Sequence, residues 1–576
     1  MSCSEPSKEQ CLPPTLATLA DVITLIERDP GLRAPRRKAM LSALRTVARL
    51  LNGAPASIAA DPSALRCRLA GVSHAAVGLS RGRWNNVRCL TLAALKTAGF
   101  RIMPQRASAP SAPAWKKLEA SLPDLQSRCG LSRLITFCTG HAIGPTAVDA
   151  AVFERFREAL LTETFARRPI TVYRSACTTW NAAASSIAGW PKVQIPVPDL
   201  SRRVALPWSA FPDSFREGAE AYLNRQSNRD PFSDDYAESA SASTIRLQRN
   251  QILLTATALV RSGVPAEQIT GLAVLVEPEN AKLALHYLYD RAGGKSTRSI
   301  HARAVLLHSI AKHWLKASPE QLQLLADLSH RLAIKKSGMT PKNRARLRQF
   351  DDKANLDALL GLPRRVLQQV KRADSGSRRD ALRVMFAVAI ELFIVAAIRV
   401  TNMASLEVGR HLVHARLGPN SVVHLVISED EIKNDVPCEL PLPAESAELL
   451  ATYLSVFRPR LSAARSSWLF PNHKGKRRAT TRFSTQIAEF IHDETGITMN
   501  AHLFRHLAMK LHFDAHPEDV ETGRRVLGHK NRSTTLQYYA DLKSPAAFRR
   551  YDAMIAGLRE AAAVNPEPTR RRVAAP

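Results

Sequence analysis

Apolar residues recur with the i, i+3, i+4 spacing of amphipathic helices along most of this 576-residue chain. The spacing is clear in LSALRTVARLL (41–51), FERFREALL (153–161) and NQILLTATALV (250–260). Before residue 330, no run with the alternating pattern of a strand competes with it. This part of the chain is therefore predicted to be helical throughout.

The pattern changes toward the C-terminal end. After a long helix predicted over Arg378 to Ile398, the segment SVVHLVISEDEIKNDVPCELPLP (421–443) contains two β-rich runs. They flank the polar segment SEDEIKND, which is typical of a hairpin with a polar tip. Helical spacing resumes at Ala444. We expect a mainly α, multidomain fold whose last domain is α+β, with one small antiparallel sheet.

Proline- and serine-rich stretches at 106–115, 190–212 and 335–343 divide the chain. The length also predicts about three or four domains. We expect a helical N-terminal domain at 1–105, a second helical domain at 115–200, a third at 213–330, a fourth domain at 340–562 and a basic tail at 563–576.

The first three blocks have similar ends. GLSRGRWNNVRCLTLAALKTAG, ITVYRSACTTWNAAASSIAG and GGKSTRSIHARAVLLHSIAKHW each begin with basic and hydroxyl residues and continue as an Ala-rich helix. Two interpretations remain open. The three blocks are diverged copies of one helical module, or they share only the residue pattern that helical bundles have in common.

The charge balance points to a polyanionic partner. Lys and Arg total 81 against 51 Asp and Glu, for a net charge of +30. A GC-rich genome would explain the preference for Arg over Lys but not the shortage of acidic residues. Nucleic acid is therefore the expected partner.

The cysteines and apolar runs suggest a soluble protein of a reducing compartment. The eight cysteines are scattered without a C-x-x-C pair, so neither a disulfide framework nor a zinc knuckle is indicated. The longest apolar run, Val384 to Ile398, is interrupted by Glu391 and is too short to span a bilayer. We expect a cytoplasmic protein with no membrane partner.

The block from residue 340 contains five short segments with reactive side chains. AAIRVTNMASLEV places Arg399 at the polar end of an apolar helix, and EIKNDV places Lys433 at the hairpin tip. HLFRHL places His502 and Arg505 one helical turn apart. LGHK places His529 after a Leu-Gly helix stop, and the tyrosines follow. Taken singly, each has an ordinary explanation, such as a helix-terminal cation or a solvated turn lysine.

Together these residues suit one chemistry. Two guanidiniums can bind the non-bridging oxygens of a phosphodiester and neutralise charge that grows in the transition state. A lysine can protonate a leaving alkoxide, a histidine can take a phenolic proton, and a tyrosine can attack phosphorus. A phenol with a pKa of about 10 needs such a base and nearby positive charge. No cofactor or metal is expected.

The order Arg399, Lys433, His502-x-x-Arg505, LGH with His529, and a tyrosine after TT resembles the tyrosine recombinases, the phage-integrase type of site-specific recombinase. The resemblance covers roughly residues 340 to 560. Residues 213–330 are similar in character and placement to the family's core-binding (SAM-like) domain, which forms the other half of a DNA clamp. One departure is Asn402, where the family frequently has an acidic residue that supports the arginine.

The resemblance implies a role for each residue. Arg399 and Arg505 would hold the scissile phosphate, with His529 hydrogen-bonded to it. Lys433 would be the general acid and His502 the general base. The tyrosine would form a 3′-phosphotyrosyl bond, so strand exchange would need neither ATP nor metal.

Two adjacent tyrosines compete for the role of nucleophile. Family members place it nine or ten residues beyond the LGH histidine, and this spacing admits both Tyr538 and Tyr539. The following residues favour Tyr539, because YADL fits the family's usual small residue, His or Asp, and aliphatic residue. Tyr539 also shares a helical face with Leu536, which would fix the direction of the phenol.

The function implied is site-specific recombination or integration of double-stranded DNA, in the service of a mobile element. The implied assembly is a dimer on one DNA site and a tetramer in the synapse, located at the bacterial nucleoid. One alternative is a type IB topoisomerase-like enzyme, against which the amphipathic segment SPAAFRRYDAMIAGLREAAA speaks, since it could dock on a neighbouring protomer. Another is a catalytically retired site-specific DNA-binding protein, which the complete set of six residues disfavours.

Overall fold

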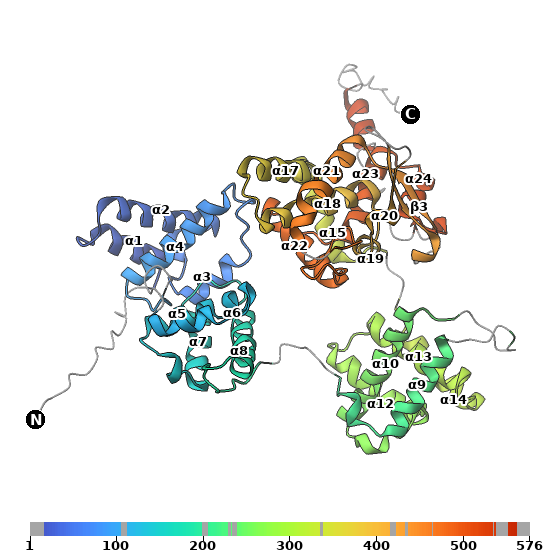
Figure 1. Cartoon of the computed structure of the whole chain (residues 1–576). Coiled ribbons are helices and arrows are strands. Elements are labelled where there is room, and N and C mark those ends of the chain that lie inside the picture. The colour runs from blue at the N-terminus through green and yellow to red at the C-terminus, as the bar shows by residue number, and fades with distance from the viewer. Residues whose placement is uncertain are drawn as a thin grey trace, which may run out of the picture. The chain divides into compact units, whose positions relative to one another are not determined.

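A computed structural model of the chain describes residues 17–104, 112–198, 205–227, 232, 239–334, 338–414, 422–432, 436–462, 465–533, 535–536 and 551–560. The chain divides into two compact units, which are residues 1–198 together with 337–576, and residues 199–336. Their elements are labelled in Figure 1.

The first helices of the chain pack on a small core of aliphatic residues. Thr18 and Asp21 form a reciprocal capping box at the start of the first helix, and Ser80 caps the fourth. Leu44 of α2 and Val87 of α4 are fully buried where the two longest of these helices pack together. The helices are α1 (Leu19–Arg28), α2 (Ala34–Leu50), α3 (Pro62–Leu69) and α4 (Arg81–Thr97).

The next four helices enclose an aromatic core. The ring of Trp180 meets Trp115 at a centroid distance of 6.4 Å and Trp190 at 5.4 Å, and all three side chains are buried. Large aromatic side chains supply much apolar area in a small bundle. The helices are α5 (Pro113–Ala120), α6 (Leu125–Gly140), α7 (Ala150–Thr162) and α8 (Pro169–Ser186).

Residues 199–336 form a helical unit with its own core, in which Phe215, Ile252 and Ile310 are fully buried. Ser241, Thr297 and Ser318 cap helices at their N-termini. The helices are α9 (Asp213–Ser227), α10 (Ala242–Arg261), α11 (Leu272–Val276), α12 (Pro278–Arg291), α13 (Arg298–His313) and α14 (Pro319–Arg331).

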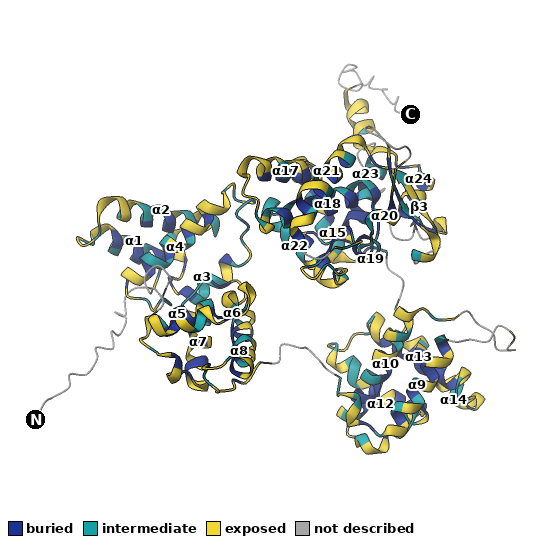
Figure 2. Cartoon of the chain, viewed as in Figure 1, coloured by how far each residue is buried: buried dark blue, intermediate teal, exposed yellow. Residues whose placement is uncertain are grey.

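Residues 338–533 are built around one central helix, α18 (Arg378–Ala396), most of which is buried from Ala381 onward (Figure 2). It contacts helices that cover it on several sides, because nearly every residue in its apolar stretch is hydrophobic. The other helices are α15 (Pro341–Arg348), α16 (Lys353–Leu360), α17 (Leu362–Ala373), α19 (Val400–Ala404), α20 (Val408–His411), α21 (Ala444–Thr452), the π-helical turn Tyr453–Phe457, α22 (Thr480–Thr495), α23 (Leu503–Ala515) and α24 (Val520–Leu527).

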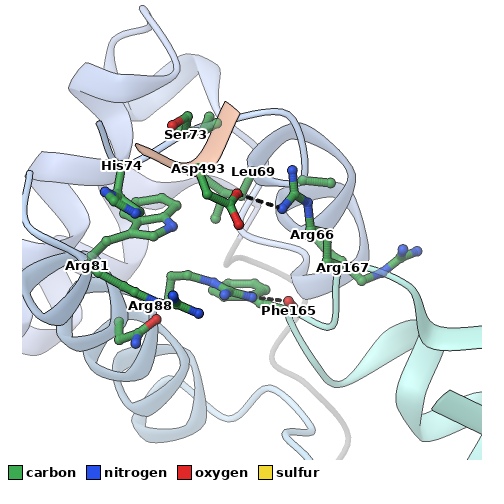
Figure 3. Close-up of a pocket in the computed structure, with 13 residues that line it drawn as sticks. Arg66, Leu69, Ser73, His74, Arg81, Arg88, Phe165, Arg167 and Asp493 are labelled. Atoms are coloured by element: carbon green, nitrogen blue, oxygen red, sulfur yellow. Dashed lines mark hydrogen bonds and ion pairs between the residues drawn. The ribbon is translucent and has the colours of Figure 1, made fainter. Parts of the chain in front are cut away.

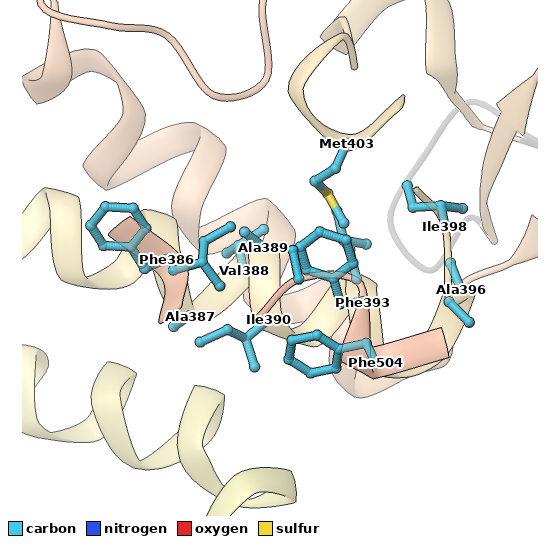
Figure 4. Close-up of a cluster of buried hydrophobic side chains, with 14 of the residues drawn as sticks. Phe386, Ala387, Val388, Ala389, Ile390, Phe393, Ala396, Ile398, Met403 and Phe504 are labelled. Atoms are coloured by element: carbon cyan, nitrogen blue, oxygen red, sulfur yellow. The ribbon is translucent and has the colours of Figure 1, made fainter. Parts of the chain in front are cut away.

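A stacked aromatic pair joins α18 to α23. The rings of Phe393 and Phe504 lie 5.1 Å apart between centroids, with an angle of 13° between their planes (Figure 4). Phe504 directly precedes Arg505, so this contact fixes the first turn of α23 against the core. The candidate site is built on these two helices.

The predicted hairpin is present as β2 (Val423–Ile427) and β3 (Cys438–Pro441), which pair antiparallel with Ile427 opposite Cys438. The sequence pattern missed a third strand, β1 (Leu412–His414), which pairs antiparallel with β2. Its three residues directly follow α20 and are too few to show strand alternation. Within the described residues the sheet order is β1-β2-β3.

Helices with one small antiparallel sheet make up the described parts of the chain, which confirms the expected fold class. Among the helices of these parts, none combines the length and apolar character that crossing a bilayer requires.

Residues 17–198 pack against α22 within the first unit. The Ser73 hydroxyl donates a hydrogen bond of 2.7 Å to the carbonyl oxygen of His492. Gly496, at φ +82°, approaches Ala76 so closely that a Cβ at Gly496 would lie 2.4 Å from the Cβ of Ala76. Arg168 also forms an ion pair with Glu489. This contact joins the N-terminal helices to the segment that leads into α23.

Candidate active site

A cavity of about 260 Å³ lies where the end of α18, the start of α19, β3 and the end of α24 meet. Arg399 and Arg505 both line it, although they are 106 positions apart in the sequence, and Asn402 lies beside them. Arg525 and Glu439 are the other charged lining residues. The cavity therefore has an excess of guanidinium groups, as an anion-binding site requires.

Arg399 is the N-cap residue of α19 and not the end of the preceding helix. The expected helix Arg378 to Ile398 ends two residues earlier, at Ala396. Ala397 takes the left-handed conformation with φ +47°, which stops α18 and turns the chain. Arg399 therefore has an extended backbone and directly precedes α19.

Arg505 is buried, with 5% of its surface exposed. Its guanidinium donates one hydrogen bond of 2.7 Å to the carbonyl oxygen of Ala397 and another of 2.6 Å to that of Leu527. These carbonyls lie at the C-terminal ends of α18 and α24, where helix dipoles favour a cation. Two helix ends thus offset the cost of burying the charge and orient it beside the cavity.

His502 is the N-cap residue of α23, one turn before Arg505 as the sequence predicted. Burial lowers the pKa of its imidazole, and the positive charges of Arg505 and Arg399 lower it further. The neutral ring therefore persists at neutral pH, with a nitrogen able to accept a proton.

His506, which sequence reasoning did not select, meets His502 edge to face with ring centroids 4.9 Å apart. Its pKa is lowered to about 4 by burial, by His502 and by Arg505. The i, i+4 spacing of the two histidines in HLFRHL was the available signal.

His529 follows Gly528, which ends α24 in the left-handed conformation at φ +57°, so the predicted Leu-Gly stop is confirmed. Burial lowers the pKa of His529 to about 4, together with the charges of Arg505, Arg399 and Arg524. Because both site arginines act on both His502 and His529, the four side chains belong to one electrostatic cluster.

Thr535 is a second residue that sequence reasoning missed. Its hydroxyl lies 2.9 Å from Nδ1 of His529, and both side chains are buried. A hydroxyl in contact with Nδ1 constrains which way the imidazole faces. The adjacent threonines before the tyrosines were the sequence signal.

Lys433, Tyr538 and Tyr539 lie outside the described residues. The described neighbours of Lys433 in the chain, Ile432 and Val436, both line the cavity. The last described residues before the tyrosines are Thr535 and Leu536.

Residues 365–544 match the model of the phage integrase family. The chain therefore contains a domain of the phage integrase family, the tyrosine recombinases. A search of curated proteins found no match to the chain.

Solved structures similar to the chain share little sequence with it. A lambda integrase(75-356) dimer bound to a COC′ core site is 14% identical, with 56% of this chain and 94% of that chain covered and a TM-score of 0.34. XerA recombinase is 14% identical, with 61% and 99% covered and a TM-score of 0.22. XerH site-specific recombinase bound to difH is 13% identical, with 56% and 89% covered and a TM-score of 0.29.

Proposed function

We propose that this protein is a site-specific DNA recombinase or integrase that cuts and rejoins double-stranded DNA for a mobile element. The observation that carries the proposal is the cluster of Arg399, Arg505, His502 and His529 in a phage integrase family domain. The two arginines of this cluster line one cavity. Two cations beside two neutral imidazoles suit a phosphodiester, which needs charge neutralisation and proton transfer at once.

In the proposed cleavage step, the phenolic oxygen of Tyr539 attacks the scissile phosphorus while His502 accepts the phenolic proton. The bond from phosphorus to the 5′ oxygen breaks, and Lys433 protonates that oxygen. The products are a free 5′-hydroxyl and a 3′-phosphotyrosyl bond. Attack by the 5′-hydroxyl of another strand reverses these transfers, restores a phosphodiester and releases the tyrosine.

The arginines and His529 would act on the phosphate. Arg399 and Arg505 would bind its non-bridging oxygens as negative charge builds up on them. With Nδ1 against Thr535, His529 would offer Nε2–H to a phosphate oxygen. An arriving phosphate would also offset the two guanidinium charges that lower the pKa of His502, which would strengthen that histidine as a base.

We propose DNA as the partner, with two protomers on one site and four in the synapse. The net charge of +30 supports binding led by phosphate contacts. The proposed compartment is the bacterial cytoplasm, at the nucleoid.

The test is covalent adduct formation with duplexes that carry the DNA flanking the gene, nicked so that cleavage is trapped. Tyr539→Phe should abolish the adduct and leave DNA affinity unchanged, because it removes one oxygen and keeps the ring. Tyr538→Phe is the matched control and should retain the adduct. The reverse result would make Tyr538 the nucleophile, and adduct in both variants would refute the proposed chemistry.

A further inference from the structure

A second cavity, of about 130 Å³, lies within the first unit and shares no lining residue with the cavity of the candidate active site. Figure 3 shows the side chains around it. Its wall is formed by α3, α4, the chain that follows α7 and the C-terminal end of α22. Arg66, Arg81, Arg88 and Arg167 line it, and Asp493 is the carboxylate among its lining residues. Guanidiniums from three segments of the N-terminal helices thus surround a space next to the integrase domain.

The charges around this cavity do not balance. Asp493 accepts a hydrogen bond of 3.1 Å from Arg167, which leaves Arg66, Arg81 and Arg88 without a carboxylate partner among the lining residues. Burial lowers the pKa of Arg88, and the charges of Arg133 and Arg167 also lower it. Like charges held together in a partly buried space favour the binding of an anion.

Part of the cluster has a structural role. Arg66 donates to the carbonyl oxygen of Leu161 at 3.2 Å and so caps the last turn of α7. Arg88 donates to the carbonyl oxygen of Phe165, in the chain that follows α7. Each of these bonds uses one nitrogen of a group that has five N–H donors. These two bonds therefore account for only a minority of the N–H donors of Arg66 and Arg88.

Arg81 has no such role. It is an exposed residue in the first turn of α4, and within the described residues its side chain makes neither a hydrogen bond nor an ion pair. Trp84 and Asn85, from the same end of α4, also line the cavity. Helix N-termini favour negative charge, and this one adds to the field of the guanidiniums.

We propose that this cavity binds a tetrahedral oxyanion of the phosphate class, held by Arg66, Arg81 and Arg88. Cavities of about 150 Å³ accept ligands as large as benzene, so this one has room for a phosphate group. The phosphate belongs either to the backbone of a DNA duplex or to a free phosphate compound.

Binding here would tie the N-terminal helices to the integrase domain. The anion would offset the repulsion among arginines contributed by 66–88 and 165–167, next to the ion pair between Arg167 and Asp493. Asp493 lies near the end of α22, nine residues before His502. The site is thus placed to stabilise the contact between residues 17–198 and the segment that leads to α23.

The test compares Arg81→Gln with Arg83→Gln in the full-length chain. Both arginines are exposed and lie in the first turn of α4, but Arg83 faces Ser42 of α2 and does not line the cavity. Neither substitution removes a buried contact, so both variants should fold. Binding is measured by calorimetry with inorganic phosphate, at constant ionic strength against chloride, and separately with a DNA duplex.

If a free phosphate compound is the ligand, Arg81→Gln weakens phosphate binding at least tenfold while both variants bind the duplex alike. If the DNA backbone is the ligand, Arg81→Gln weakens duplex binding several-fold more than Arg83→Gln, and inorganic phosphate competes. Equal behaviour of the two variants with both probes overturns the proposal. Neither probe requires strand cleavage, so this result is independent of the proposed recombination.

Discussion

The hydroxyl of Thr535 lies 2.9 Å from Nδ1 of His529, and both residues are buried. The charges of Arg505, Arg399 and Arg524 act on the imidazole. The proposed phosphate contact needs His529 to be neutral and to present Nε2 to the phosphate. The threonine satisfies the second need, and the burial and positive charge around the ring satisfy the first.

Replacing Thr535 by valine should slow adduct formation about tenfold or more with little change in DNA affinity. The substitution keeps the shape and leaves Nδ1 of a buried imidazole without its partner, a loss of about 1–3 kcal/mol. Thr535→Ser keeps the hydroxyl and should recover most of the rate. Single-turnover cleavage of a nicked duplex measures the effect, and a serine variant as slow as valine would contradict the orienting role.

Arg505→Lys should reduce adduct formation about 10²-fold or more while the charge is retained. A lysine cannot donate to the carbonyls of Ala397 and Leu527 and also bind a phosphate as a planar fork. Arg525→Lys is the control, because Arg525 lines the same cavity but is exposed and paired with Glu521. Equal losses in the two variants would show that adduct formation depends on positive charge in the cavity and not on the orientation of the Arg505 guanidinium.

Acidification should destabilise the integrase domain through its buried histidines. The pKa of His506 is about 4 in the folded protein, below its ordinary value of 6.5, so the unfolded chain binds more protons between these values. Stability is therefore full above pH 6.5 and is lost as the pH falls toward 4. His506 alone should contribute a loss of roughly 2 kcal/mol in unfolding free energy between pH 7 and pH 5.

Urea unfolding at pH 7 and pH 5 measures this loss. The difference between the two pH values should shrink in His506→Gln, because the titrating group is gone. His414→Gln, which changes an exposed histidine of β1, should behave as the parent protein does. A pH dependence that His506→Gln leaves unchanged would assign the effect to other groups.

Gly496→Ala should loosen the contact between residues 17–198 and α22. The added Cβ would lie 2.4 Å from the Cβ of Ala76, and the backbone at φ +82° also disfavours an L side chain by about 1 kcal/mol or more. Gly189→Ala is the control, since Gly189 has a similar φ of +77° with nothing within 4 Å of the added atom. Hydrogen exchange of residues 70–80 should accelerate in the first variant alone.

The sequence by itself determined the helical character, the β2–β3 hairpin and the Leu-Gly stop before His529. Each depends on residues within a few positions of one another, through side-chain periodicity or the conformational freedom of glycine. The sequence also indicated Arg399, His502, Arg505 and His529 as candidate site residues, and the structure brings them into one cluster.

Only the tertiary structure decided how that cluster is held. The left-handed turn at Ala397 is stabilised by a hydrogen bond from Arg505, 108 residues away, so no local pattern could place the end of α18 or the start of α19. Strand β1 exists because β2 offers it a partner. The cavity lined by Arg66, Arg81 and Arg88 exists because residues 66–88, residues 165–167 and the end of α22 converge. Contacts between residues far apart in sequence depend on the packing of the whole unit, which short-range spacing does not encode.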